Sequence, residues 1–309
     1  MQYAKLLLER FGIRKTKQQK EEFRRWLMVE LKQLGYFAYE ESGSSGAVNV
    51  VAGEPEKVKL LLTAHYDTAV ALPFPTFYTP YHPWLYFLYQ GLMIFLAMAL
   101  CFVLAFAAGF ALGQPGLVMP LTLVLMVALL VYFAAGPAAK HTANANTSGV
   151  ALLLEIAKAM PAPLKKKVAF VFFDMGQGSL TGANGYKRKH LKELDKQMLV
   201  NFDCVGDGDT AVLLPSKKAK WDGELLDAIN VAFSGEAGKY QLRLQGWGMH
   251  PSDNRKFKRS VAVLTANFRK AIGPCITGVC GNKDTVLKEE NLRYLCESTI
   301  KMIEIYTEE

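Results

Sequence analysis

Two long uncharged runs constrain this chain more than any other feature of its sequence. Residues 83–112 and 117–139 contain no Asp, Glu, Lys or Arg, and only Gly113-Gln114-Pro115-Gly116 separates them. A bilayer core of about 30 Å is crossed by about 20 apolar helical residues, and a helix satisfies its own backbone hydrogen bonds where water is absent. The runs therefore predict a transmembrane helical hairpin. The alternative, a pair of core helices that are apolar on every face, would require burial on all sides within 309 residues.

The positions of the charges predict which side of the membrane each part occupies. The tip of the hairpin carries no charge, Lys140 and His141 follow the second run directly, and all 36 Lys and Arg residues lie outside the two runs. By the positive-inside rule, we expect both termini and the soluble part in the cytoplasm. Residues 1–23 lack an apolar core followed by a small-residue cleavage site, so we expect an amphipathic helix there and no signal peptide. The predicted location is the cell membrane, crossed twice.

Outside the hairpin, strand-forming and helix-forming segments alternate along the chain. We expect residues 1–82 and 140–309 to form one cytoplasmic α/β domain, with residues 83–139 inserted as the hairpin. The alternation predicts a mostly parallel, twisted sheet with helices on both faces, in which ligands gather at the carboxyl ends of the strands. The expected strands are 48–51, 58–63, 168–173, 198–203 and 261–265, and the expected helices are 3–34, 148–160, 182–194, 224–233 and 287–307.

Cysteine spacing and net charge narrow the range of partners. The five cysteines include no short CxxC pair, as a zinc knuckle or redox motif would require, and we expect reduced thiols. The net charge is +8, yet the sequence has no basic helix or basic patch interleaved with aromatic residues, so we expect no nucleic-acid partner. Proximity to anionic lipid explains the positive surplus. The expected partners are the lipid bilayer and a membrane protein or peptide.

Polar motifs stand at the ends of several expected strands. His65 and Asp67 follow the apolar run at 60–64, and a His with an Asp two residues on can supply a metal-binding imidazole whose ring the Asp orients. A His near an Asp is also an ordinary hydrogen-bonded pair, so this motif alone decides nothing. The other motifs are residues 144–149 (NANTSG), 172–182 (FFDMGQGSLTG), 201–203 (NFD) and 283–285 (KDT).

In their order and spacing, these five motifs resemble those of the M28 family of zinc-dependent aminopeptidases, from about residue 59 to residue 306. The resemblance implies a parallel-rich α/β fold and a cocatalytic pair of zinc ions. It implies that His65 is a zinc ligand with Asp67 behind it, and that Asp203 supplies a further carboxylate. Family members also have an Asp that bridges the two metals, a Glu-Glu pair whose first member is the general base, and a last His.

This chain departs from the family pattern at most of those further positions. Ala145 stands where the bridging Asp is expected, Gly176 and Gln177 stand in place of the Glu-Glu pair, and Cys280 stands where the last His is expected. Two dications a few Å apart require a bridging carboxylate to screen their repulsion. Activation of water requires a basic group, and Gly176 has no side chain. We therefore expect no two-zinc chemistry.

The remaining donors leave two expectations for metal binding. The first is that no metal cofactor binds; the alternative is a single zinc ion held by the remnant ligands His65 and Asp203 together with the Cys280 thiolate. We expect no catalytic residue. The residues expected to support or line the cleft are Asp67, Asn144, Asn146, Asp174, Gln177, His250, Asp253 and Asp284.

The position of the hairpin bears on function. It lies between the His65 motif and the motif at 144–149, so both of its helices should leave the face of the domain that carries the cleft. We expect a membrane-anchored, catalytically inactive binding or scaffold protein whose cleft faces the bilayer and takes a peptide, a lipid-linked group or a partner's juxtamembrane segment. Two alternatives stay open. One is an active hydrolase with one zinc ion or atypical ligands. The other is a structural subunit of a membrane complex, whose small residues pack against partner helices: Gly91, Ala97, Gly109 and Gly136.

Overall fold

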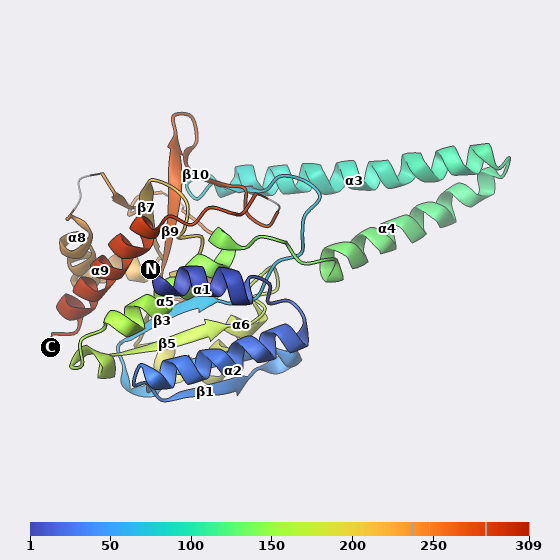
Figure 1. The fold of residues 1–309 in the computed structure, drawn as a ribbon. Helices are drawn as coiled ribbons and strands as arrows, with labels where there is room; N and C mark the ends of the chain where they lie inside the picture. Colours follow the sequence, from blue (N-terminus) through green and yellow to red (C-terminus); the bar gives the residue numbers. More distant parts are fainter. Residues whose placement is uncertain (236–237, 247, 282, 309) are drawn as a thin grey trace.

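A mixed β-sheet of ten strands forms the middle of the domain (Figure 1). The computed structural model describes residues 1–235, 238–246, 248–281 and 283–308. Within these ranges the strand order is β1-β2-β5-β3-β6-β9-β10-β4, and β7 pairs with both β8 and β9. The strands are β1 (Ala38–Ser42), β2 (Val48–Ala52), β3 (Leu60–His65), β4 (Phe77–Tyr78), β5 (Val168–Phe173), β6 (Met198–Phe202), β7 (Thr210–Pro215), β8 (Tyr240–Leu242), β9 (Ser260–Arg269) and β10 (Gly273–Thr277).

The four central strands β5, β3, β6 and β9 pair in parallel. They are apolar and mostly buried, as strands covered on both faces must be. The flanking pairs β1–β2 and β9–β10 are antiparallel, because connections of a few residues can only reverse the chain. All five predicted strands form, and besides this central set β7 and β8 also pair in parallel. The central pairing places the carboxyl ends of β3, β5 and β6 at one edge of the sheet.

Helices cover both faces of the sheet. On one face, α1 (Gln2–Phe11), α2 (Lys17–Gln33), α5 (Ser148–Ala159), α8 (Gly223–Phe233) and α9 (Glu289–Tyr306) enclose a core that includes Leu60 and Leu62. On the opposite face, α6 (Thr181–Lys189) packs over Leu61 and Val171. Leu60 and Leu61 belong to different cores because successive side chains of a strand point to opposite faces.

The single helix predicted over residues 3–34 is wrong, because α1 ends at Phe11 and α2 begins at Lys17. A capping box starts the second helix: the Gln19 backbone N–H donates to Thr16 Oγ1 at 3.2 Å, and Thr16 N–H donates to Gln19 Oε1 at 3.0 Å. Arg14 lies fully buried in the connection. The predicted helix over 182–194 is likewise two, α6 and α7 (Leu191–Leu194).

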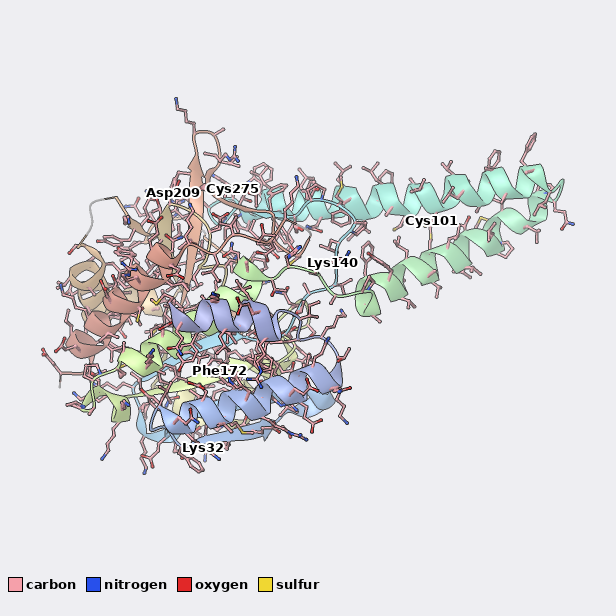
Figure 2. All side chains as sticks on the ribbon, viewed as in Figure 1. Lys32, Cys101, Lys140, Phe172, Asp209 and Cys275 are labelled. Atoms are coloured by element: carbon pink, nitrogen blue, oxygen red, sulfur yellow. The ribbon has the colours of Figure 1, made fainter. Side chains whose placement is uncertain are left out.

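The two uncharged runs form α3 (Pro83–Ala111) and α4 (Val118–Ala135), which project together from the domain (Figure 1). Only 6% of the most apolar window of each helix is buried, so neither is a core helix of the domain. Their side chains point outward along most of their length (Figure 2). Both are long and apolar enough to cross a membrane.

The hairpin helices touch near their tip and diverge toward the domain (Figure 1). A Cβ on Gly109 would lie 2.8 Å from Val118 Cγ2, so the missing side chain permits the close approach there. Gly91, nearer the domain, has open space around it. At the base, Tyr132 donates a hydrogen bond from its hydroxyl to the Ala71 carbonyl at 2.9 Å. This hydrogen bond attaches α4 to the loop that follows β3.

Candidate functional site

The site lies where β3 and β6 end. His65 is the last residue of β3 and Asp203 directly follows β6. Parallel pairing of the two strands brings His65 Nε2 to 3.7 Å from Asp203 Oδ1, while His65 Nδ1 lies 3.2 Å from Asp67 Oδ1. All three side chains are buried. The structure thus brings together the two predicted remnant ligands and the Asp predicted to orient the imidazole.

His250 completes a line of alternating carboxylates and imidazoles. Its Nε2 lies 3.1 Å from Asp203 Oδ2, so Asp203 stands between two buried histidines. The ring of Tyr78 contacts His250 edge-on, with 5.1 Å between ring centroids. In the part of the chain that the structure describes, His250 Nδ1 has no hydrogen-bond partner. Sequence placed His250 near the cleft, and the structure puts it in direct contact with Asp203. We call Asp67, His65, Asp203 and His250 the polar line.

The carboxylates and imidazoles of the polar line shift one another's pKa values. Burial acts to lower the pKa of His65, but Asp203 and Asp67 outweigh it and raise that pKa well above its usual range. Burial acts to raise the pKa of Asp203, but His250 and His65 outweigh it and hold that pKa well below its usual range. Both shifts favour the charged forms, an imidazolium at His65 between the carboxylates of Asp67 and Asp203. The imidazolium supplies positive charge beside carboxylates that would otherwise need a cation.

Gly176 packs directly against the His65 side chain. A Cβ on Gly176 would lie 2.5 Å from His65 Cγ, closer still to His65 Cβ, and 2.9 Å from Asp253 Oδ2. The backbone N–H groups of Gly176 and Gln177 donate to the two oxygens of Asp67, at 2.6 and 3.1 Å. This arrangement leaves no room for any side chain at position 176. Gln177 reaches His65 Nε2 at 3.4 Å, but its amide is neutral and cannot act as a base.

The segment 144–149 is structural in this arrangement. The side chain of Ala145 has no atom that could bind a metal ion. Asn146 donates to the Phe202 carbonyl at 3.0 Å, and its Oδ1 accepts hydrogen bonds from Gly149 N–H and Cys204 N–H, both at 3.2 Å. Asn146 therefore holds the start of α5 against the turn that follows β6. Among the described residues, these contacts use the amide of Asn146 entirely within the protein scaffold.

Asp284 fixes the same segment from the other side. Its carboxylate accepts hydrogen bonds from the backbone N–H groups of Asn144, at 2.6 Å, and Ala145, at 3.0 Å. Asn144 Oδ1 in turn accepts from Gly206 N–H at 2.7 Å. Asp284 and Asn144 thus hold the backbone of this segment and of the turn after β6. Asp174, also predicted near the cleft, is buried and pairs with Lys20 Nζ at 2.6 Å.

Asp253 is the least satisfied group of the site. It is fully buried, and neither carboxylate oxygen has a hydrogen-bond partner among the described residues. Burial raises the pKa of Asp253 to about 7.

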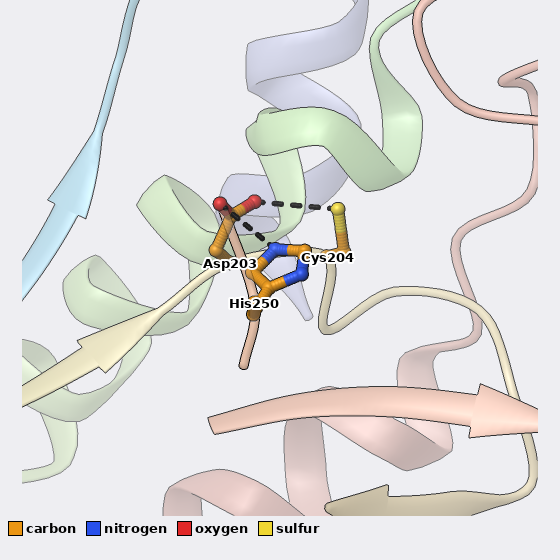
Figure 3. Close-up of side chains that lie close together, drawn as sticks. All are labelled: Asp203, Cys204 and His250. Atoms are coloured by element: carbon orange, nitrogen blue, oxygen red, sulfur yellow. Dashed lines mark hydrogen bonds and ion pairs between the residues drawn. The ribbon is translucent and has the colours of Figure 1, made fainter. Parts of the chain in front are cut away.

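The thiol nearest the polar line belongs to Cys204, which the sequence analysis did not single out. Cys204 Sγ lies 3.3 Å from Asp203 Oδ1, and the donor atoms of Asp203, Cys204 and His250 all lie within 4.8 Å of one another (Figure 3). Cys280 is buried next to Gln177, 3.9 Å from its Oε1, and does not join this group. The position of Cys204 next to Asp203 in the sequence is the one feature that could have indicated a thiol at this site.

Residues 130–286 match peptidase family M28. The chain belongs to this family. The predicted resemblance is therefore confirmed, and the matched segment includes the ends of β5 and β6 and the segment 144–149.

Several solved structures share the fold of this M28 chain. A glutaminyl cyclase from Porphyromonas gingivalis has 16% identity and a TM-score of 0.62, with 98% of this chain and 96% of that chain covered. A Zn-dependent exopeptidase from Parabacteroides distasonis has 16% identity and a TM-score of 0.62, covering 98% and 95%. The LapA aminopeptidase of Legionella pneumophila has 12% identity and a TM-score of 0.60, covering 100% and 71%. Comparison with curated protein sequences finds no match. At these identities the likeness shows the fold alone.

The M28 chain fits one zinc ion better than two. Ala145 has no side-chain carboxylate to bridge a pair of ions, and His65 fills the space beside Gly176. Asp203, Cys204 and His250 offer a carboxylate, a thiol and an imidazole, which are the donor types that zinc prefers. These three residues would hold a single ion, which would act there as a Lewis acid. Burial raises the pKa of Cys204 well above its usual range, so the thiol would have to lose its proton on binding.

Proposed function

We propose that this M28 protein is a membrane-anchored, non-catalytic member of its family, and that it binds a ligand in the cleft beside the base of the hairpin. One observation carries the proposal. The position from which a family member would present its general base is Gly176, and the His65 ring occupies the space that a side chain there would need. The site therefore lacks the Glu that would act as the general base at this position in the family pattern.

The charges of the polar line support the same conclusion. A metallopeptidase site holds its carboxylates together with metal ions, whereas here the His65 imidazole lies between Asp67 and Asp203. In such an arrangement an imidazole takes the place beside the carboxylates that a metal ion would otherwise occupy.

The exposed apolar surface of the hairpin supports membrane anchoring. Large side chains such as Phe95, Phe106 and Leu130 are 63%, 55% and 67% exposed. A contiguous apolar surface of this extent on two long helices is stable in lipid and strongly unfavourable in water. With uncharged Gln114 at the tip, the proposed orientation has the tip across the membrane and the domain in the cytoplasm.

The group of Asp203, Cys204 and His250 favours a second candidate, a protein that holds one zinc ion. The three donors meet at a buried position, which suits a structural ion or a polarising one. In this candidate the absence of a side chain at Gly176 still removes the general base of the family.

Zinc content separates the two candidates. Elemental mass spectrometry of the detergent-purified protein is expected to give background zinc for the wild type and for His65→Ala. One zinc ion per chain that is lost in Cys204→Ser and retained in Cys280→Ser would instead establish the second candidate. Zinc-dependent release of amino acids from aminoacyl p-nitroanilides by the wild type would overturn the non-catalytic proposal.

Cysteine labelling tests the membrane topology. The five native cysteines are buried, so an introduced cysteine gives the main signal. We expect a membrane-impermeant maleimide to label Gln114→Cys in intact cells, and to label Lys140→Cys only after permeabilisation. Equal labelling of both variants before permeabilisation would contradict the proposed orientation. Co-purification of a stoichiometric membrane partner would favour the structural-subunit alternative.

A further inference from the structure

A pocket of about 800 Å³ separates the polar line from the base of the hairpin. Asp67, Gln177 and Cys280 line it on the side of the polar line, and Phe87 of α3 and Phe133 of α4 line it on the side of the helices. This volume lies in the range of pockets that bind small molecules, about 300–1,000 Å³. One wall of the pocket is therefore polar and belongs to the domain, and the other is aromatic and belongs to the two helices.

Three basic side chains reach the pocket, and two of them have no counter-ion. Lys20 pairs with Asp174. Lys15 and Arg255 also line the pocket, and neither makes an ion pair within the described part of the chain. The carboxylate of the lining residue Asp67 faces the His65 ring and two backbone N–H groups. The pocket thus presents unpaired positive charge.

Lys15 is held in place by its neighbour. Arg14 is fully buried; its backbone N–H donates to Thr68 Oγ1 at 2.9 Å, and its guanidinium donates to Thr147 Oγ1 at 3.0 Å. Thr68 N–H donates back to the Arg14 carbonyl at 3.1 Å. These bonds fix the backbone of Lys15 at the pocket edge. Burial lowers the pKa of Lys15, and the charge of Asp67 offsets this effect only in part, so the ammonium is partly desolvated.

The aromatic wall belongs to the ends of α3 and α4 that adjoin the domain. Near the tip, α3 and α4 meet at Gly109 and Val118, and toward the domain they diverge (Figure 1). Phe87 and Phe133 line the pocket at the base of this divergence. An apolar chain that lies between the helices in a bilayer would therefore end at the pocket, next to Lys15 and Arg255.

We propose that this pocket binds an anionic phospholipid of the surrounding membrane, with its phosphate group held by Lys15 and Arg255 and its acyl chains between the bases of α3 and α4. Charge-assisted hydrogen bonds from two cations suit a phosphate group, and aromatic side chains at a membrane interface suit the glycerol and upper acyl region. The proposal rests on the proposed membrane insertion and does not depend on the loss of catalysis.

Isothermal titration of the full-length, detergent-purified protein tests the proposal with short-chain lipids that stay monomeric. The probes are dihexanoyl phosphatidylglycerol, dihexanoyl phosphatidylcholine and inorganic phosphate. We expect phosphatidylglycerol to bind at least tenfold more tightly than either of the other two. The double variant Lys15→Ala/Arg255→Ala should lose this preference, while the matched variant Lys17→Ala/Lys256→Ala, which removes two nearby cations that do not line the pocket, should keep it.

Each contrary result has a defined meaning. Equal binding of phosphatidylglycerol and phosphatidylcholine, or an unchanged double variant, would overturn the assignment of the phosphate to Lys15 and Arg255. Inorganic phosphate that binds as tightly as phosphatidylglycerol would overturn the role of the acyl chains. The labelling of Gln114→Cys reports membrane insertion independently, and zinc content reports catalytic capacity independently. A failure of the lipid proposal is therefore distinguishable from a failure of either part of the proposed function.

Discussion

Restoring an acidic side chain at position 176 should destabilise this protein and should not activate it. In Gly176→Glu the new Cβ would lie 2.5 Å from His65 Cγ, and the new carboxylate would enter a buried site that already holds Asp67, Asp203 and Asp253. The backbone of Gly176 needs no positive φ, so the effect of the substitution is steric and electrostatic. Both terms oppose folding.

The steric and the electrostatic costs can be distinguished by comparing a small and a large substitution. Forcing a methyl group into a packed site costs typically about 1–3 kcal/mol, so we expect Gly176→Ala to lose about 2 kcal/mol. A buried carboxylate without a partner adds roughly 3–5 kcal/mol, which brings Gly176→Glu to about 6 kcal/mol. For a domain of about 250 residues, 1 kcal/mol shifts the melting temperature by about 2–4 °C. The expected decreases are therefore about 4–8 °C for Gly176→Ala and roughly three times that for Gly176→Glu.

Thermal unfolding in detergent, followed by circular dichroism at one fixed scan rate, measures both shifts. Gly223→Ala is the matched control, because no heavy atom lies within 4 Å of where its Cβ would be. There we expect no loss, and a gain of up to about 1 kcal/mol from the reduced freedom of the unfolded chain. If Gly176→Glu melted with the wild type, or acquired zinc-dependent aminopeptidase activity, His65 would have to move away readily, and the argument that it closes the site would be refuted.

Three further predictions concern the buried charges. Lys20→Met should destabilise the protein by about 3 kcal/mol in chemical unfolding because it leaves Asp174 buried without its partner, whereas Lys17→Met should have little effect. A carboxyl whose pKa is raised on folding stabilises the fold below its unfolded pKa, and this stabilisation is lost as the pH rises to the folded pKa. The pKa of Asp253 is about 7 in the fold. Between roughly pH 4 and pH 7, the free energy of unfolding of the wild type should therefore decrease by about 4 kcal/mol relative to that of Asp253→Asn. If the free energies of unfolding of the two proteins changed in parallel over that pH range, this prediction would be contradicted. Asp284→Ala should cost about 2–4 kcal/mol, since two buried backbone N–H groups lose their acceptor, and a loss below 1 kcal/mol would show that water replaces it.

The features that the sequence predicts well are those with a strong apolar pattern. The uncharged runs give α3 and α4, and the apolar segments give the central strands, whose parallel order then brings His65 and Asp203 together. Short or polar strands have too few apolar residues to be recognised. In β1, for example, three of the five residues are polar and only the first is buried. The break between α1 and α2 depends on a capping box and on buried Arg14, and apolar periodicity detects neither.

Within the site, the sequence does not specify contacts that depend on side-chain direction. The family pattern points to Cys280 as a donor, and the structure places another thiol, that of Cys204, beside Asp203. His250 comes from an irregular segment whose path across the sheet edge has no signature in the sequence. The packing of His65 on Gly176 depends on the rotamer of His65 and on the close approach of the Gly176 backbone, and residue type alone specifies neither.

The pairing of β3 sets a rule for how this chain can be made. Strand β3 is synthesised before the hairpin, and both of its neighbours, β5 and β6, are synthesised after it. Because hydrogen-bonded neighbours must share a compartment, the number of membrane crossings between them has to be even. Residues 38–65 also cannot complete their sheet until both crossings have been made. In a membrane-inserted chain, folding of the domain therefore follows integration of the hairpin, and a chain arrested after α3 would leave β3 without partners.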